Sequence, residues 1–336
     1  MTVKRCLIAA GIAALAAISV TPAANAEPLK IRAAWIATPP SLLPIMFPKP
    51  GIAKHQGVTY DLEAIHFNSS PTQITALAAG EIELGTLNFA SFPIAVLNAN
   101  MTDLRIICDE TQDGHDDYVT NQYMVLQDSP FKKVEDLKGK MLAVIGIGAG
   151  ADIGMRAGLA KHGLLYPRDY NIIEVRLPSM KAELMERKVD LAAFFPPFLY
   201  DPDIPKVARS LFTMKDGLGG SELSFWIMRS AFIQQHRAVV VDLLEDAVRV
   251  YRWYADPKNH QEAIATLAAV FKLPPERFDW AFTKKDNYRD LNGEPDVAMI
   301  QRNIDTVKEL GFIKSSIDVA HYTDLSLVKE GAARIK

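Results

Sequence analysis

The amino-acid sequence predicts an α/β fold that is large enough for two globular units. Short apolar runs with the length of buried strands alternate with segments of helical periodicity over most of the chain. Hydrophobic residues make up 49% of the 336 residues, so the chain can bury a sizeable core. From Ala231 onward the pattern becomes almost wholly helical. These features favour sheets flanked by helices over an all-α or all-β fold.

The first 26 residues have the pattern of a secretory signal peptide. Two basic residues precede an apolar run from Leu7 to Val20, and small residues lead up to Ala26. We expect cleavage after Ala26, so that the mature chain begins at Glu27. No later apolar run approaches the length of a membrane-spanning helix, and we expect a soluble product.

The composition of the mature chain excludes several classes of protein. Cleavage leaves 35 basic and 40 acidic residues, a formal net charge of −5, because only Lys4 and Arg5 are removed. A mildly acidic chain has no electrostatic attraction to nucleic acid or anionic lipid, and we expect neither partner. The single remaining cysteine, Cys108, excludes a disulfide within the chain and a cysteine-based zinc or iron-sulfur framework.

The first part of the mature chain alternates strands and helices. A helix over 69–80 is the clearest element, since a serine can cap it, Pro71 falls in its first turn and Gly80 follows its end. The prolines of 38–51 predict a loop with one helical turn. We expect strands over 29–37, 58–67, 83–88 and 104–110, and a second helix over 91–99.

A second α/β set follows, and a helical tail completes the chain. The tail shows two apolar stripes at helical spacing, which predict helices packed on a core. Their residues are Val240, Leu244, Ala247, Tyr251 and Tyr254, and then Val297, Ile300, Ile304 and Val307. In the second set we expect strands over 122–129, 141–146, 171–177 and 189–195, helices over 151–163 and 179–188, and one more strand over 222–230.

The glycine-rich run at 146–151 fits a dinucleotide-binding pattern, with Glu174 near the place of a ribose-binding acid. Two facts disfavour that interpretation. The run lies in the middle of the second set, not in its first strand-helix turn, and an exported protein meets little NAD. Two interpretations remain, a purely structural turn and a helix start whose backbone N–H groups meet another ligand.

Other motifs give weaker signals. The sequence contains no G-x-S-x-G, H-E-x-x-H or Walker motif, so no hydrolase signature is present. The acidic run 113–118 is interpreted as a solvated loop, because adjacent residues rarely converge on one metal ion. The run 194–198, Phe-Phe-Pro-Pro-Phe, predicts a rigid apolar loop after a strand, where ligands of α/β folds bind.

The order of these segments resembles a family of known proteins over the whole mature chain. The stretches ALAAGEIELGTLN (76–88), SPFKKVEDLKGKMLAVIGIGAGAD (129–152), MERKVDLAAFFPPF (185–198) and YTDLSLVKE (322–330) carry the resemblance. They look like a periplasmic solute-binding protein of an ABC importer, in the nitrate, taurine and aliphatic-sulfonate class.

The resemblance implies a two-lobed periplasmic binding protein fold of type II, with two mixed sheets flanked by helices and two crossings between the lobes. One lobe is expected to comprise 27–118 and 229–336, and the other 119–228. The crossings are expected near 121–127 and 224–230.

The implied function is capture of a small organic solute between the lobes. The closed form would then deliver the solute to a membrane permease and its ATPase. The protein is expected to be a periplasmic monomer that is not an enzyme and that uses no cofactor or metal. Two alternatives stay open, an enzyme of thiamine pyrimidine precursor synthesis on the same fold and a receptor that senses solute without transport.

Candidate ligand-binding residues follow from the ends of the predicted strands and from the positions of ligand-holding loops in the resembled family. Asp152 is expected to cap the helix after the glycine run. Its carboxylate disfavours a strongly anionic solute and could accept from an amine or hydroxyl. The expected set is Trp35, Thr38, Ser69, Ser70, Leu87, Asn88, Tyr118, Gly148, Ala149, Gly150, Asp152, Phe195 and Pro196.

Overall fold

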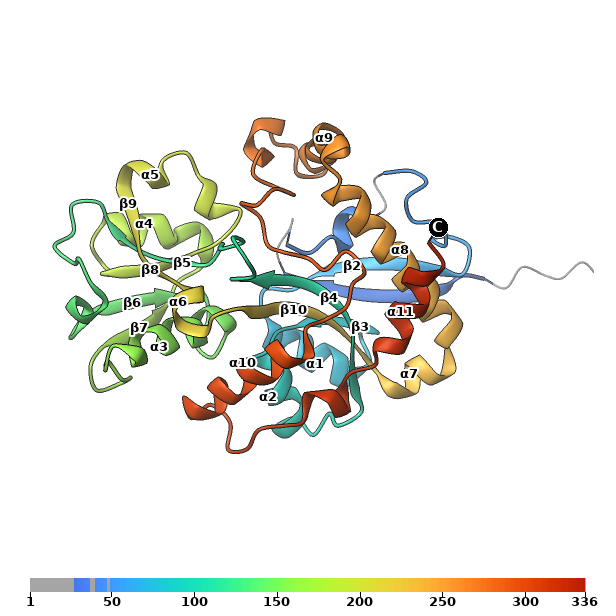
Figure 1. The fold of residues 1–336 in the computed structure, drawn as a ribbon, viewed down its shortest axis with the longest axis horizontal. Helices are drawn as coiled ribbons and strands as arrows, with labels where there is room; N and C mark the ends of the chain where they lie inside the picture. Colours follow the sequence, from blue (N-terminus) through green and yellow to red (C-terminus); the bar gives the residue numbers. More distant parts are fainter. Residues whose placement is uncertain (1–26, 37–39, 47–48, 336) are drawn as a thin grey trace, which may run out of the picture.

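The chain forms two α/β lobes, each built on a five-stranded sheet. The computed structural model describes residues 27–36, 40–46 and 49–335, so the expected signal peptide and Thr38 lie outside the described residues. Figure 1 shows the sheet of β5 to β9 at one end of the molecule and the sheet of β1 to β4 with β10 at the other. Within these ranges no helix is long and apolar enough to cross a membrane.

The first sheet has the strand order β2-β1-β3-β10-β4. β1 pairs in parallel with β2 and β3, whereas β10 runs antiparallel to both β3 and β4, so the sheet is mixed. Strand β10 therefore separates β3 from β4, its neighbour in the sequence. The bounds are β1 (Leu29–Trp35), β2 (Tyr60–His66), β3 (Leu84–Leu87), β4 (Leu104–Asp113) and β10 (Ser221–Arg229).

The second sheet has the order β7-β6-β8-β5-β9 and is also mixed. β6 is parallel to β7 and β8, and β5 is antiparallel to β8 and β9. Strand β9 was not expected from the sequence, because its alternation is irregular and it follows a proline-rich segment. The bounds are β5 (Gln122–Leu126), β6 (Met141–Val144), β7 (Asn171–Glu174), β8 (Leu191–Phe194) and β9 (Ala208–Thr213).

Helices cover both sheets, and their ends follow the local sequence. α1 contains Pro71 in its first turn and ends at Gly80, whose φ of 69° is left-handed, although the Ser69 side chain makes no capping bond. The helices are α1 (Ser70–Ala79), α2 (Ser91–Leu97), α3 (Gly150–Lys161), α4 (Met180–Met185), α5 (Ile204–Val207), α6 (Met214–Leu218), α7 (Ser230–Gln235), α8 (Arg237–Ala255), α9 (His260–Phe271), α10 (Val297–Glu309) and α11 (Leu325–Ala333). Short 3-10 turns are η1 (Leu43–Ile45), η2 (Val134–Leu137), η3 (Leu177–Ser179), η4 (Phe198–Tyr200), η5 (Pro257–Asn259), η6 (Pro275–Phe278) and η7 (Val319–Tyr322).

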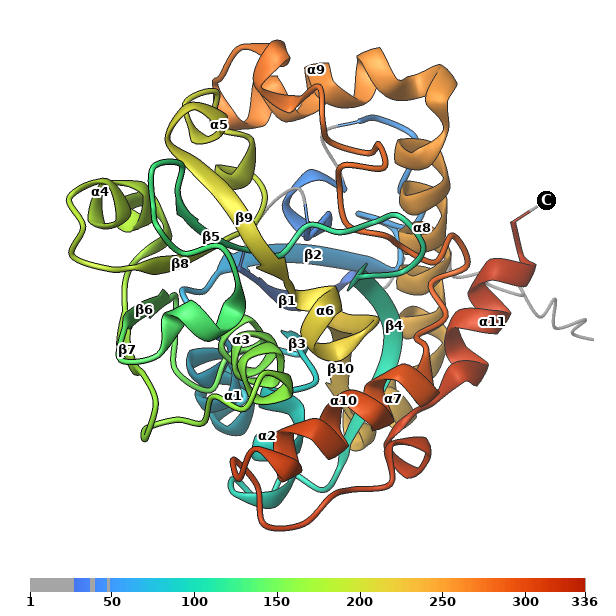
Figure 2. The ribbon, with the colours of Figure 1, turned by 60° about the vertical axis from the view of Figure 1, so that its left-hand side comes forward.

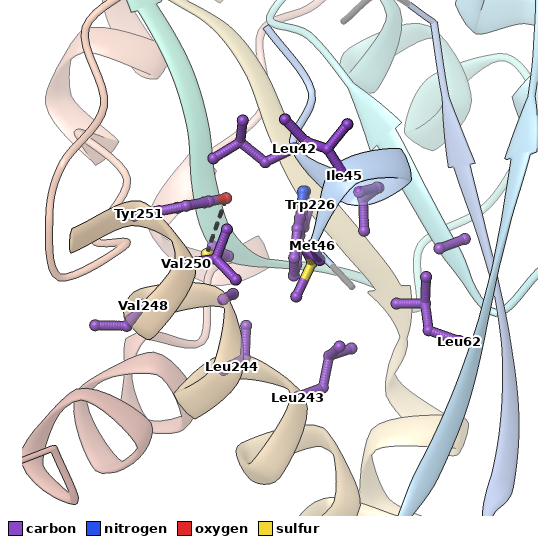
Figure 3. Packing of buried hydrophobic residues seen from close by; sticks show 14 of the residues in the cluster. Leu42, Ile45, Met46, Leu62, Trp226, Leu243, Leu244, Val248, Val250 and Tyr251 are labelled. Carbon is purple, nitrogen blue, oxygen red and sulfur yellow. Dashed lines mark hydrogen bonds between the residues drawn. The ribbon is translucent and has the colours of Figure 1, made fainter. Parts of the chain in front are cut away.

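The two faces of the first sheet are buried by different helices. On one face the stripe of α8 packs on the sheet and on η1, and Figure 3 shows Leu244 and Tyr251 of α8 near Trp226 of β10. On the other face α1, α2 and α10 bury a second cluster, which includes the predicted Ile300, Ile304 and Val307. The predicted stripes are therefore core surfaces, as expected from their spacing.

The return of the chain to the first lobe differs from the expected boundary. Residues up to 228 were expected in the second lobe, but β10 pairs with β4 from Ser221 onward. The segment 221–228 therefore belongs to the first sheet. A hydrophobic pattern identifies a strand but not the sheet that it joins, which explains the difference. The expected first boundary, at 118/119, falls between the ends of β4 and β5.

Candidate functional site

The glycine loop, defined here as residues 145–150, connects β6 to α3 in the second lobe. Gly148 has a φ of 80°, a left-handed conformation that favours glycine. Ala149 is the N-cap of α3 and has no capping side chain. The first-turn N–H groups of α3 have no carbonyl partner within the helix, which is the general property of helix starts that suits them to acceptors and anions.

Asp152 lies beneath this loop instead of on its surface. Its carboxylate is 0% exposed, and Oδ2 accepts from the Gly148 N–H at 2.8 Å. Oδ1 accepts from Nε of Arg156 at 2.8 Å, one helical turn later. In this structure both carboxylate oxygens are occupied by the loop and by Arg156, and the contact of Asp152 with a solute stays a prediction. The guanidinium adjacent to the carboxylate compensates its charge, which weakens the expected repulsion of anions.

Glu174 also has a structural role at the glycine loop. Its Oε1 accepts from the Ile147 N–H at 2.7 Å. The acidic residue that completed the dinucleotide-binding pattern therefore fixes the loop from β7.

Arg156 connects the glycine loop to the first lobe. Its guanidinium carbon lies 4.1 Å from the ring centroid of Tyr166, in the second lobe, and 4.8 Å from that of Phe312, which follows α10. A Cβ built on Gly148 would lie 3.7 Å from the Phe312 ring. The loop and its supporting ion pair therefore contact the opposite lobe.

A second contact between the lobes joins the start of α3 to the loop after β3. A Cβ on Gly150 would lie 3.6 Å from the Phe89 ring and 3.8 Å from Nδ2 of Asn88. Oδ1 of Asn88 accepts from the Ala90 and Ser91 N–H groups at 3.0 and 2.8 Å, which fixes the amide. The structure therefore brings together two predicted site segments that are about 60 residues apart in the sequence.

The other predicted residues divide into accessible and buried positions. Trp35 is half-buried at the end of β1, where its ring meets His66 at 4.6 Å, and Phe195 is half-buried after β8. Leu87 is 1% exposed, and its side chain belongs to the hydrophobic core. Ser69 is half-buried at the start of α1, whereas Ser70 and Pro196 are buried.

Tyr118 lines a cavity that the sequence did not reveal. The cavity has a volume of about 230 Å³ and lies among the crossing segment, the end of α8 and the segment 279–296. The ring of Tyr118 meets that of Tyr288 edge-on at 5.4 Å. The segment 279–296 has little regular periodicity, so its aromatic residues gave no signal. The lining residues are Leu42, Tyr118, Tyr251, Tyr254, Ala255, Phe282, Thr283, Asn287, Tyr288, Arg289 and Leu291.

The lobes also meet beside this cavity. Tyr200 of η4 stacks on Trp280 with ring centroids 4.9 Å apart, and its hydroxyl donates to the Lys285 carbonyl. Figure 2 shows the segment 279–296 running from α9 towards the first crossing. Contacts at this side and at the glycine loop hold the lobes together in the structure.

Within the described ranges, one group of side chains has the composition of a metal site, away from the loops above. His55, Asp242 and Glu245 place ligand atoms within 4.8 Å of one another. Arg334 lies 2.9 Å from Asp242, and Arg249 forms an ion pair with Glu245. Because two guanidinium groups already compensate these carboxylates, the group is an ion-pair network between α8 and its neighbours.

Two α/β lobes joined by two crossings, with loops in contact between them, place the chain in the fold class shared by solved periplasmic binding proteins. Within this class the chain belongs to the NMT1-like family, whose model matches residues 24–268. It is 25% identical to the taurine-binding periplasmic protein of Escherichia coli K12 over 231 residues, which cover 66% of this chain and 67% of that protein. The expected resemblance is thereby confirmed.

Solved structures share the fold. The alkanesulfonate-binding protein SsuA of Xanthomonas axonopodis, bound to MOPS, is 20% identical with a TM-score of 0.71 and covers 89% of this chain and 99% of its own. The aliphatic sulphonate binding protein SsuA of Escherichia coli is 18% identical with a TM-score of 0.68, covering 88% and 97%. The nitrate-binding protein NrtA of Synechocystis is 16% identical with a TM-score of 0.70, covering 92% and 90%.

Proposed function

We propose that the protein is the solute-binding component of an ABC importer, which captures a small organic solute between its lobes and presents it to a membrane permease and its ATPase. The main supporting observation is the contact between Gly150 of the second lobe and Asn88 and Phe89 of the first. A solute held there would touch both lobes only in the closed form, and its binding would therefore favour closure.

The solute class includes small anions. The compensated charge of Asp152 leaves the N–H groups at the start of α3 without an adjacent net negative charge. Asn88 provides an amide donor at the same place. The names of the relatives, which bind taurine, sulfonates and nitrate, support the same class. Trp35 and Phe195 are available to contact an apolar part of an organic solute.

A thermal-shift series tests the proposed function. Purified mature protein is mixed with taurine, short alkanesulfonates and nitrate, with NAD as the control. A solute that binds the folded form at 100 times its Kd stabilises it by about 2.7 kcal/mol, which raises the unfolding temperature. We expect a shift with one solute class and none with NAD. A large shift with NAD alone would contradict the proposal.

A variant tests the position of the site. Gly150→Leu would place a side chain between the lobes, so it should weaken binding of the active solute at least tenfold by calorimetry. Lys161→Leu, at the exposed last turn of the same helix, is the matched control and should bind normally. Equal affinities of Gly150→Leu and Lys161→Leu for the solute would show that Gly150 is not part of the binding site.

The enzyme alternative, whose chemistry we associate with a cysteine-rich motif, has little support because only Cys108 follows the expected cleavage site. Cys108 is fully buried, and burial raises the pKa of its thiol well above the usual range, so the thiol is neither accessible nor ionised. A turnover assay on the solute that stabilises the protein separates the two functions, since sustained product formation would favour the enzyme. A solute sensor without transport remains the other alternative, and reconstitution with the permease distinguishes it.

We further propose export to the periplasm, with cleavage after Ala26, and a monomeric state. N-terminal sequencing of the exported protein should begin at Glu27. Light scattering of the mature protein should give the mass of one chain with and without solute.

A further inference from the structure

Two buried carboxyl groups face each other where the first lobe leads into the second. Asp109 lies on β4, the strand from which the chain leaves the first lobe, and Glu222 lies on β10, the strand by which it returns. Both side chains are 0% exposed. Glu222 is only one residue from Ser221, which pairs with Asp113 at the end of β4. The two carboxyls therefore lie in the strands that form both crossings.

Each carboxyl has one oxygen that accepts from the backbone and one that does not. Oδ2 of Asp109 accepts from the Asp290 N–H at 2.7 Å, and Oε2 of Glu222 accepts from the Asp296 N–H at 3.3 Å. Oδ1 of Asp109 and Oε1 of Glu222 are buried and receive no hydrogen bond from an N–H or hydroxyl donor in the described part of the chain. The two carboxyl groups lie within electrostatic and hydrogen-bonding range of each other.

A hydrogen bond between two carboxyl groups requires a proton on one of them. Ionised carboxylates are acceptors only, so two of them in contact would repel each other and leave two buried charges unsatisfied. One carboxylic acid and one carboxylate, or two acids, remove this conflict. Burial of both groups, with one oxygen of each lacking a donor, therefore favours a shared proton.

The surrounding groups add more negative charge than positive. Asp290 and Asp296 face the pair from the segment that precedes α10, and Arg289 is the cation that acts on Asp109. Three neutral groups, the Cys108 thiol and the Tyr251 and Tyr288 hydroxyls, also lie within electrostatic range of Asp109. Burial, followed by the proximity of Asp109, raises the pKa of Glu222 well above its usual range. Burial raises the pKa of Asp109 to about 7.

We propose that Asp109 and Glu222 form a proton-binding site, which holds a proton between β4 and β10 at neutral pH and thereby joins the strands of both crossings. The site has no known role in solute capture, and it is independent of the proposed function. Its consequence is a junction between the lobes that is sensitive to external pH.

The direction of the pH effect follows from the raised pKa values. The unfolded chain releases these protons near pH 4, whereas the folded chain retains them. The folded state therefore binds more protons than the unfolded state at neutral pH, and the free energy of unfolding falls as pH rises through the folded pKa values. A variant that cannot ionise at one of the two positions should lose part of this dependence.

Infrared spectroscopy of the mature protein tests the site directly. A protonated carboxyl has a C=O band that is separate from the carboxylate bands. We expect such a band at pH 7 in the wild type and its loss in Glu222→Gln, whereas Asp109→Asn should retain a band because burial alone already raises the pKa of Glu222. Glu110→Gln is the matched control, because Glu110 is a buried carboxyl on the same strand that accepts from Ser41, Ser224 and Trp226. The control should retain the band, and its loss only in Glu110→Gln would overturn the proposal.

Urea unfolding between pH 5 and 9 provides a second readout. Other titrating groups are common to all variants, so they cancel in the difference from the wild type. We compare the folding equilibrium constant of Glu222→Gln with that of the wild type at each pH. The ratio of variant to wild type should rise at least tenfold from pH 5 to pH 9, because one pKa unit corresponds to a tenfold change in an equilibrium constant. Parallel pH profiles for the two proteins would overturn the proposal.

Discussion

At the scale of single residues, Asp152 determines what the glycine loop can bind. Its carboxylate supports the loop from below through Gly148 and is compensated by Arg156. The sequence contained the signal for this pair, because Asp152 and Arg156 are four residues apart on a predicted helix, a spacing that favours an ion pair. Its burial beneath the loop was not predicted, because sequence position does not show which side of a loop faces the solvent.

Replacing Asp152 should reduce stability more than it reduces binding. Asp152→Ala leaves the buried Arg156, whose side chain is 9% exposed, without its partner. The expected loss is about 3–5 kcal/mol, the usual cost of an unpaired buried charge. Urea unfolding measures it. The double variant Asp152→Ala, Arg156→Ala should recover part of the lost stability. If Asp152→Ala instead keeps its stability and binds the solute more weakly, Asp152 contacts the solute.

At the scale of elements, strands and helices were predicted from periodicity, but their partners were not. The helix over 69–80 was predicted almost residue by residue, because Pro71 and Gly80 limit it through local backbone geometry. Strand β9 was missed, and β10 was found but assigned to the wrong lobe. Pairing depends on long-range contacts, which a single sequence does not specify. For the same reason the cavity beside Tyr118 was not predicted.

Close packing of α3 on α6 depends on glycines, and Gly217 is the one that faces backbone atoms of α3. A Cβ on Gly217 would lie 2.5 Å from the Gly154 carbonyl oxygen and 2.8 Å from the Gly158 nitrogen, both backbone atoms. Gly217→Ala should therefore destabilise the protein by about 1–3 kcal/mol, the usual cost of overpacking. Gly146→Ala is the control, since its nearest contact would be 3.7 Å. Equal urea midpoints for the two variants would contradict this close packing.

The long helix α8 should be the element of the first lobe whose buried side chains cost the most stability when they are truncated. Leu244 is 0% exposed and lies in the cluster shown in Figure 3. Leu244→Ala should cost about 2–5 kcal/mol, through lost burial and the cavity that remains. Val239→Ala, at a half-buried position of the same helix, should cost less. Calorimetric unfolding of both variants checks the order of the two losses.

At the scale of the whole molecule, the two lobes are held by contacts on both sides of the loops between them. The fold class and the two lobes were predicted, because the order of several segments resembled known proteins over the whole mature chain. The contacts that hold the lobes were not, because they join residues far apart in the sequence, Arg156 with Phe312 and Tyr200 with Trp280.

Removing the Tyr200 contact should favour the open form. Tyr200→Ala loses both the stacking on Trp280 and the hydrogen bond to Lys285. Small-angle scattering of the solute-free variant should show a larger radius of gyration than the wild type. Tyr200→Phe, which keeps the ring, should have an intermediate value. Identical scattering from all three proteins would show that this contact does not contribute to closure.

The position of β10 between β3 and β4 also has a consequence for the order of assembly. During synthesis or export from the amino end, all five strands of the second sheet, within 122–213, appear before β10, the strand that separates β3 from β4. The second lobe can therefore complete its sheet while the first still lacks an inner strand. The half of the molecule that begins the chain is the last to become a complete lobe, and until α8 and α10 follow β10 its apolar surfaces remain open to chaperones and proteases.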